Sequence, residues 1–145
     1  MAVNRSLTPW VIFSTHRPYY ISSTNFAPMS GDQTVATQLR HGFEDLLHEF
    51  QVDISFGAHH HSYQRSCSGL YRSKCGHPGG MTVIDLGMAG AGNSKDVQLP
   101  QPAIWEVVDA SHHGYCRIKA NSTHFHLEYV RGLRREVFDS ITLTK

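Results

Sequence analysis

Apolar residues in the first half of the chain form two short runs and, between them, one periodic stretch. Residues 10–15, WVIFST, are rich in apolar and β-branched side chains, which predicts a buried strand ending just before His16. Residues 52–56, VDISF, predict a second such strand. Between the two runs, and after Asp32 as the expected N-cap, apolar residues recur at helical spacing: Val35, Leu39, Phe43, Leu46, Leu47 and Phe50. This order predicts a strand, helix, strand unit of the α/β class.

The second half of the chain has a different period. Residues 81–93, MTVIDLGMAGAGN, predict a third strand that runs into a glycine-rich turn. Beyond it, apolar and polar residues alternate in three segments, 114–120, 124–130 and 135–144, separated by turns at 121–123 and 131–134. Such alternation is typical of an antiparallel meander with one face on the core. We therefore expect an α/β front and an antiparallel β rear that share one core.

Length and charge limit the kind of protein that this is. The 145 residues are in the range of one domain, and 13 Lys and Arg against 12 Asp and Glu give a net charge of +1. That balance indicates neither a nucleic-acid partner nor an anionic membrane. No apolar run approaches the roughly 20 residues of a membrane span, and PWVIF is too short for the apolar region of a signal peptide. The 11 histidines are unusual for this length.

Cysteines and glycosylation motifs favour an oxidising compartment. Cys67 and Cys75 flank a short polar loop that a disulfide could close, which leaves Cys116 unpaired. The spacing permits this bridge without requiring it. Asn4 and Asn121 each begin a sequon, NRS and NST, which suggests a glycosylated, secreted chain.

Histidines follow both predicted strands of the first half. His59 and His61 lie two residues apart and share one side of an extended chain, while His60 faces the other way. His16 arrives from the other strand end, and ligands gather at the carboxyl ends of strands in α/β sheets. Three imidazoles could hold zinc with a water in the fourth position. The alternative is a solvated histidine loop beside a core His16.

Other candidate groups have weaker support. His112 and His113 lie in a polar loop context, and His124 and His126 suit an exposed strand face. The glycines of GMAGAGN lack the Lys-Ser or Lys-Thr pair of a phosphate-binding loop, so a structural turn is the better interpretation. No signature of a covalent nucleophile surrounds the serines or cysteines nearest to histidine, which are Ser14, Ser62 and Cys67.

Five motifs in order resemble one family. TPWVIFSTHRPYY, VDISFGAHHHSYQRS, GMAGAGN, GYCRIKANSTHFHLEYV and EVFDSITLTK resemble the C-terminal part of the purple acid phosphatases, in the calcineurin-like metallophosphoesterase superfamily. The resemblance implies the C-terminal half of a layered αββα sandwich. It makes residues 1–145 a single partial domain, with metal-ligand loops within about 8–95 and the meander over about 103–145.

The resemblance also implies roles for the histidines. In the family, His16 and His59 would bind the divalent metal, zinc, manganese or iron, and His61 the ferric ion, with His60 a bystander. Two positions depart from the family pattern. Phe13 stands where valine is usual, and Ala58 replaces a glycine, whose conformational freedom alanine lacks.

The motifs of the family's front half, which bring carboxylate, tyrosine and further ligands, do not occur in this sequence. Histidines that the family often has after its first ligand strand are also missing. By composition Asp32, Asp53 or Asp85 could be proposed as a bridging carboxylate, but the resemblance gives them no such role. We therefore expect the chain to carry part of the site, from a truncated gene model, a split product or a degenerate paralogue.

The resemblance implies a dinuclear phosphomonoester hydrolase, weak or inactive as the isolated chain. Its partner would be a missing N-terminal half or a second copy in a homodimer, and its location secreted, vacuolar or lysosomal. Two rival hypotheses stay open. One is a non-catalytic, histidine-rich module that binds a single metal. The other is a pseudo-phosphatase that uses its meander as an interaction surface.

Overall fold

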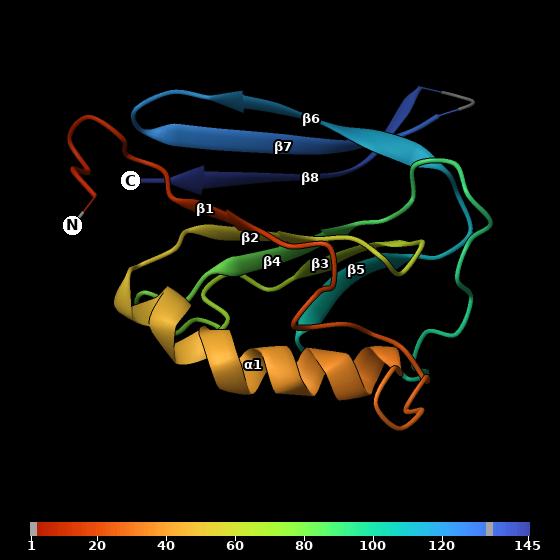
Figure 1. Ribbon diagram of the computed structural model, residues 1–145. Helices are drawn as coiled ribbons and strands as arrows, with labels where there is room; N and C mark the ends of the chain where they lie inside the picture. The colour runs from red at the N-terminus through yellow and green to blue at the C-terminus, as the bar shows by residue number, and fades with distance from the viewer. Residues whose placement is uncertain (1–2, 133–134) are drawn as a thin grey trace.

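The computed structural model describes residues 3–132 and 135–145, which form three layers (Figure 1). Helix α1 (Asp32–Glu49) covers one face of a five-stranded sheet, and a three-stranded sheet covers the other face. The five-stranded sheet has the order β1-β2-β4-β3-β5, with bounds Ile12–Ser14, Ile54–Gly57, Thr82–Leu86, Tyr63–Ser66 and Trp105–Asp109. The three-stranded sheet has the order β6-β7-β8, with bounds Gly114–Ala120, His124–Arg131 and Glu136–Thr144.

The chain order β1, α1, β2 forms a parallel crossover unit. Ile12 of β1 pairs with Ile54 of β2, and Ile54 pairs in turn with Thr82 of β4, each in parallel register. The predicted strand, helix, strand unit is therefore confirmed. Because three parallel strands end at the same edge of the sheet, the segments that follow β1, β2 and β4 meet there.

Two apolar cores lie on the two faces of the central sheet. Adjacent residues of a strand point to opposite faces, so Val83 joins the core beneath α1 while Ile84 joins the core between the sheets. The core between the sheets consists of Ile54, Tyr63, Ile84, Met88, Phe125, Leu127 and Tyr129. The rings of Tyr63 and Tyr129 stack across it with centroids 4.2 Å apart. The alternating pattern of the tail is thus explained by one face of β7 packing on the central sheet.

A buried ion pair also joins the two sheets. Arg65 of β3 donates from Nε to Asp139 Oδ2 at 2.7 Å and from Nη2 to Asp139 Oδ1 at 3.0 Å. Tyr63 donates its hydroxyl to the same Oδ2 at 2.7 Å, and Arg65 also bonds Glu106. The Arg65 and Asp139 side chains are only 9% and 8% exposed. This pair fixes β8 on the central sheet.

Helix α1 differs from its prediction in two respects. Gly31, not Asp32, is the N-cap, because the chain folds back so tightly there that a Cβ on Gly31 would lie 2.3 Å from Ala27 N. Asp32 is the first helical residue. The predicted apolar stripe is only partly covered, since Leu47 is buried while the side chains of three of its members are exposed: Phe43, Leu46 and Phe50.

The central sheet contains two strands that the sequence did not predict, β3 and β5. The expected meander begins at about residue 103, whereas Trp105–Asp109 pairs with β3 in the central sheet, and the three-stranded sheet begins at Gly114. The meander itself is confirmed, with β7 antiparallel to both neighbours. Of the turn expected over 131–134, residues 133 and 134 lie outside the described residues.

The structure bonds Cys67 to Cys75, with Cα atoms 5.8 Å apart, and leaves Cys116 as a free thiol. Burial raises the pKa of that thiol to about 12, so it stays protonated and unreactive at neutral pH. Asn4 and Asn121 are exposed at turns, a setting that suits glycosylation. Within residues 3–132 and 135–145, the structure contains no helix with the length and apolar character that a membrane-spanning segment needs.

Candidate metal centre

The candidate ligands lie in loops that follow the parallel strands. His16 follows β1, and the triplet 59–61 follows β2. The two loops are joined by a hydrogen bond from Ala58 N to His16 O at 3.1 Å. The glycine-rich loop after β4 packs on the triplet through Gly87 N to Ser62 O, also at 3.1 Å. The sheet edge therefore assembles three loops around the histidines.

His16 and His59 are in direct contact. His16 Nε2 lies 3.0 Å from His59 Nδ1, and the rings meet edge to face at 84°. Two nitrogens at this distance and with free access can act as adjacent ligands of one metal ion. Burial, with a smaller effect of the Arg17 charge, lowers the pKa of His59 and so favours the neutral imidazole that a metal requires.

His61 is oriented by the glycine-rich loop, and among the described residues its ring nitrogens do not join those of His16 and His59 in a group within 4.8 Å. Its Nδ1 is 2.7 Å from Gly92 O. A carbonyl oxygen only accepts, so Nδ1 carries the proton and Nε2 keeps its lone pair. This arrangement, with one ring nitrogen bonded to a backbone carbonyl, is the usual support of a metal-binding histidine.

The triplet is a bend rather than an extended segment. His59 has a left-handed backbone with φ of +58°, a conformation that costs energy for a residue other than glycine. Ala58, which replaces the family glycine, does not have positive φ, so its methyl group does not strain the backbone. Gly57 is the position that needs to be glycine, because a Cβ there would lie 2.3 Å from Asp85 Oδ1.

His60 turns inward, as expected for the middle residue, and is 2% exposed. Its Nδ1 lies 2.7 Å from Ser62 Oγ and its Nε2 lies 3.2 Å from Asp96 Oδ1. Burial lowers the pKa of His60, and the charge of Asp96 opposes that shift. No pattern in the sequence indicates Asp96, because this residue lies in an irregular loop after β4.

The three carboxylates weighed from composition have different surroundings. Asp53 accepts from Val11 N at 2.7 Å and from Arg5 Nη1 at 2.6 Å, which attaches the start of β2 to the segment before β1. Asp85 is fully buried within the sheet. Asp32 lies beside the centre, with Oδ1 3.7 Å from His59 Nε2 and 3.2 Å from Arg17 Nη1. Of these three, Asp32 is the carboxylate that faces a candidate ligand.

Asp85 provides a pH-dependent prediction. Both of its carboxylate oxygens are buried without a hydrogen-bond partner, and burial raises the pKa of the group well above its usual range. A raised carboxyl pKa stabilises the fold below the unfolded pKa of about 4, and that stabilisation is lost as pH rises through the folded pKa. Between these pKa values we expect wild-type stability to fall by about 1.4 kcal/mol per pH unit relative to Asp85→Asn. Urea unfolding from pH 4 to 8 measures this, and parallel stability curves would contradict it.

The remaining histidines lie away from this edge or on exposed surface. His112 Nδ1 contacts Asp109 Oδ1 at 3.0 Å, and His113 Nε2 lies 2.7 Å from Ala91 O. His124 is exposed and His126 half-buried on β7, where Thr142 contacts His126.

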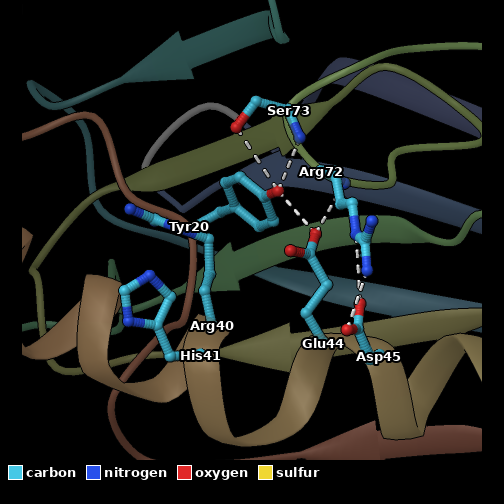
Figure 2. A pocket seen from close by; sticks show the side chains of 7 residues that line it. All are labelled: Tyr20, Arg40, His41, Glu44, Asp45, Arg72 and Ser73. Atoms are coloured by element: carbon cyan, nitrogen blue, oxygen red, sulfur yellow. Dashed lines mark hydrogen bonds and ion pairs between the residues drawn. The ribbon is translucent and has the colours of Figure 1, made fainter.

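A polar pocket of about 400 Å³ lies on the α1 side of the sheet and contains none of the predicted ligands (Figure 2). Its lining consists of Tyr20, Arg40, His41, Glu44, Asp45, Arg72 and Ser73. Glu44 Oε1 accepts from Tyr20 Oη at 2.6 Å and from Arg72 N at 2.9 Å. These bonds hold the disulfide-closed loop on the helix, so we assign these groups a structural role.

Comparisons with known proteins show which family this chain resembles. The family model for "Iron/zinc purple acid phosphatase-like protein C" matches residues 80–140. Mouse (Mus musculus) "Acid phosphatase type 7" is 31% identical over 140 residues, which is 88% of this chain and 32% of the mouse protein. "Probable inactive purple acid phosphatase 9" of Arabidopsis thaliana is 30% identical over 154 residues, 98% of this chain and 23% of that protein.

A solved purple acid phosphatase from yellow lupin (Lupinus luteus) seeds superposes on 98% of this chain and 26% of its own, with a TM-score of 0.82 and 25% identity. The fold is therefore that of a purple acid phosphatase-like protein. The chain belongs to the purple acid phosphatase family, and it corresponds to the C-terminal part of that family. It spans about a third or less of the length of these relatives.

Proposed function

We propose that this chain supplies the histidine ligands of a dinuclear metal centre that hydrolyses phosphomonoesters. The observation that carries the proposal is the contact between His16 Nε2 and His59 Nδ1, 3.0 Å apart at the edge where the parallel strands end. The centre would hold a ferric ion with zinc, manganese or iron as the divalent partner, and His61 would complete the histidine set. Exposed sequons and the Cys67–Cys75 bond support a secreted or vacuolar setting.

The donor atoms of these residues fit such metals. Imidazole suits iron and zinc, and His61 presents Nε2 with its proton held on Nδ1 by Gly92. When bound, the two metal ions would provide Lewis acidity and lower the pKa of a coordinated water. The chain's own groups orient the ligands: Gly92 O fixes the His61 ring, and Asp32 faces His59 Nε2.

Three imidazoles cannot fill two metal coordination shells, and a ferric ion favours anionic oxygen ligands. We therefore assign the remaining ligands to the part of the relatives that this chain does not span. A polypeptide with that part, in the same chain or in a partner, would complete the centre. The isolated chain is expected to be weakly active or inactive toward phosphomonoesters.

Complementation tests this proposal. Coexpression of the chain with the front half of a related acid phosphatase should restore phosphate release from a phosphomonoester at acid pH. His59→Ala should remove at least 99% of the restored rate, because it deletes a metal ligand, while His124→Ala, an exposed control on β7, should leave the rate unchanged.

Two other results would replace the proposal. One bound metal and no gain from the front half would indicate a mononuclear binding module. No metal binding, together with unchanged stability in His59→Ala and His61→Ala, would indicate a pseudo-phosphatase. The second rival has a specific observation in its favour, because the Arabidopsis relative is named probable inactive.

A further inference from the structure

A second group of metal-binding side chains lies beside the histidine pair. Asp32, His60 and Asp96 each offer one ligand atom, and these atoms all lie within 4.8 Å of one another. The group shares no residue with the set His16, His59 and His61. It brings together an imidazole and two carboxylates, a donor set that suits first-row divalent metals.

Each of the three ligands is held in place by contacts outside the group. Asp32 begins α1 and pairs with Arg17 at 3.2 Å. His60 is held through Nδ1 by Ser62 Oγ at 2.7 Å, which directs Nε2 toward the carboxylates. The Asp96 loop is attached to the segment before α1 by Thr24 N, which donates to Asp96 O at 2.6 Å. The site therefore does not need to be assembled by the metal.

The Ser23 hydroxyl lies between the Asp32 and Asp96 carboxylates, and the two carboxylates have few hydrogen-bond donors around them. Ser23 Oγ lies 2.9 Å from Asp96 Oδ2 and 3.4 Å from Asp32 Oδ2, but it has one proton to donate. His60 supplies one further N–H, to Asp96, and Arg17 already neutralises Asp32, so a cation here would balance the charge that remains on Asp96. The His60 side chain is 1% exposed and the Asp96 side chain 41%, so the group is enclosed on one side and open to ions on the other.

We infer that Asp32, His60 and Asp96 form a second site for a divalent transition metal, Zn²⁺ or Mn²⁺, within this chain. His60 would bind the ion through Nε2. Its ring proton would then lie on Nδ1, which would donate a hydrogen bond to Ser62 Oγ. Two carboxylates would balance the charge of the ion. Asp32 would connect the two sites, because the same carboxylate that binds here lies 3.7 Å from His59 Nε2.

This inference does not depend on phosphatase activity. It makes the chain a binder of two metal ions by itself, one at the His16–His59 edge and one at the Asp96 loop. The second ion would add a further link between the Asp96 loop and the start of α1, which Ser23 already connects.

Titration of the 145-residue chain with Mn²⁺ tests the inference, with bound ion counted by electron paramagnetic resonance. The informative variant is Asp96→Asn, which preserves size and removes one charge. Asp45→Asn is the matched control, because Asp45 is exposed on α1 and pairs with Arg72 away from the group. We expect Asp96→Asn to lower the affinity for one of the two Mn²⁺ ions by at least tenfold. Asp45→Asn should lower the affinity for neither ion. His61→Ala should leave the Asp96-dependent ion bound.

Amide NMR gives a second measurement that needs no variant. Mn²⁺ at this site should broaden the resonances of residues 22–24 and 94–98 in the wild-type chain. Unchanged Mn²⁺ binding in Asp96→Asn would overturn the inference. It would also be overturned if Asp96→Asn and His61→Ala each abolished binding of the same ion, because the two residues would then belong to one site. A failure of front-half complementation, by contrast, would leave these results untouched.

Discussion

Arg65→Ala is expected to lower the free energy of unfolding by about 3–5 kcal/mol, the range for breaking a buried ion pair by removing one partner. Arg65 holds Asp139 through two hydrogen bonds across the two sheets, and both side chains are buried. Without the guanidinium, the carboxylate keeps Tyr63 Oη as a donor but no countercharge. Urea denaturation at pH 7, followed by circular dichroism, measures the loss.

The double variant Arg65→Met with Asp139→Leu is the control for this prediction. It removes both charges, so we expect it to lose less stability than Arg65→Ala, although it deletes more polar contacts. If Arg65→Ala lowered the free energy of unfolding by under about 1 kcal/mol, the prediction would be wrong. The pair would then contribute no more to stability than an exposed salt bridge does.

Gly87→Ala is expected to disturb both metal-binding regions at once. A Cβ on Gly87 would lie 1.9 Å from His60 O and 3.3 Å from His61 Cα, so the triplet and the glycine-rich loop must separate. Overpacking of this kind costs up to about 3 kcal/mol. We also expect metal affinity to fall at least tenfold, since His60 and His61 move together. Isothermal titration with Zn²⁺ and thermal unfolding provide the two measurements.

Gly92→Ala is the matched control in the same loop. A Cβ at Gly92 meets nothing within 4 Å, and the carbonyl that accepts from His61 is retained. Equal losses of stability and metal affinity in Gly87→Ala and Gly92→Ala would show that the loop tolerates no added side chain at either position. The prediction, which depends on the contact between Gly87 and His60, would then be wrong.

The sequence predicts the framework because its long elements have clear periods. Helical spacing over 35–50 corresponds to α1, and the three alternating segments correspond to β6, β7 and β8. The strand ends then place His16 and the triplet at one edge, and the structure brings His16 and His59 into contact. Periodicity therefore suffices where many residues repeat one pattern.

Short or irregular elements could not be predicted in the same way. The four residues of β3 are buried throughout, so they show no alternation. β5 pairs with β3 after the long irregular segment that follows β4. Asp96 reaches His60 only through the tertiary packing of its loop. The tight turn that makes Gly31 the N-cap depends likewise on contacts with the preceding segment.

The topology of the two sheets has a consequence for the order of folding. β6, β7 and β8 pair in chain order, whereas Ile12 of β1 pairs with Ile54 of β2 on the far side of α1. Contacts that are local in sequence form faster than distant ones. The meander would then form early and offer Phe125 and Leu127 as a surface for the parallel strands. The histidine edge lies where those strands end, so it would acquire its geometry after the meander, and metal ions would meet a chain that is already compact.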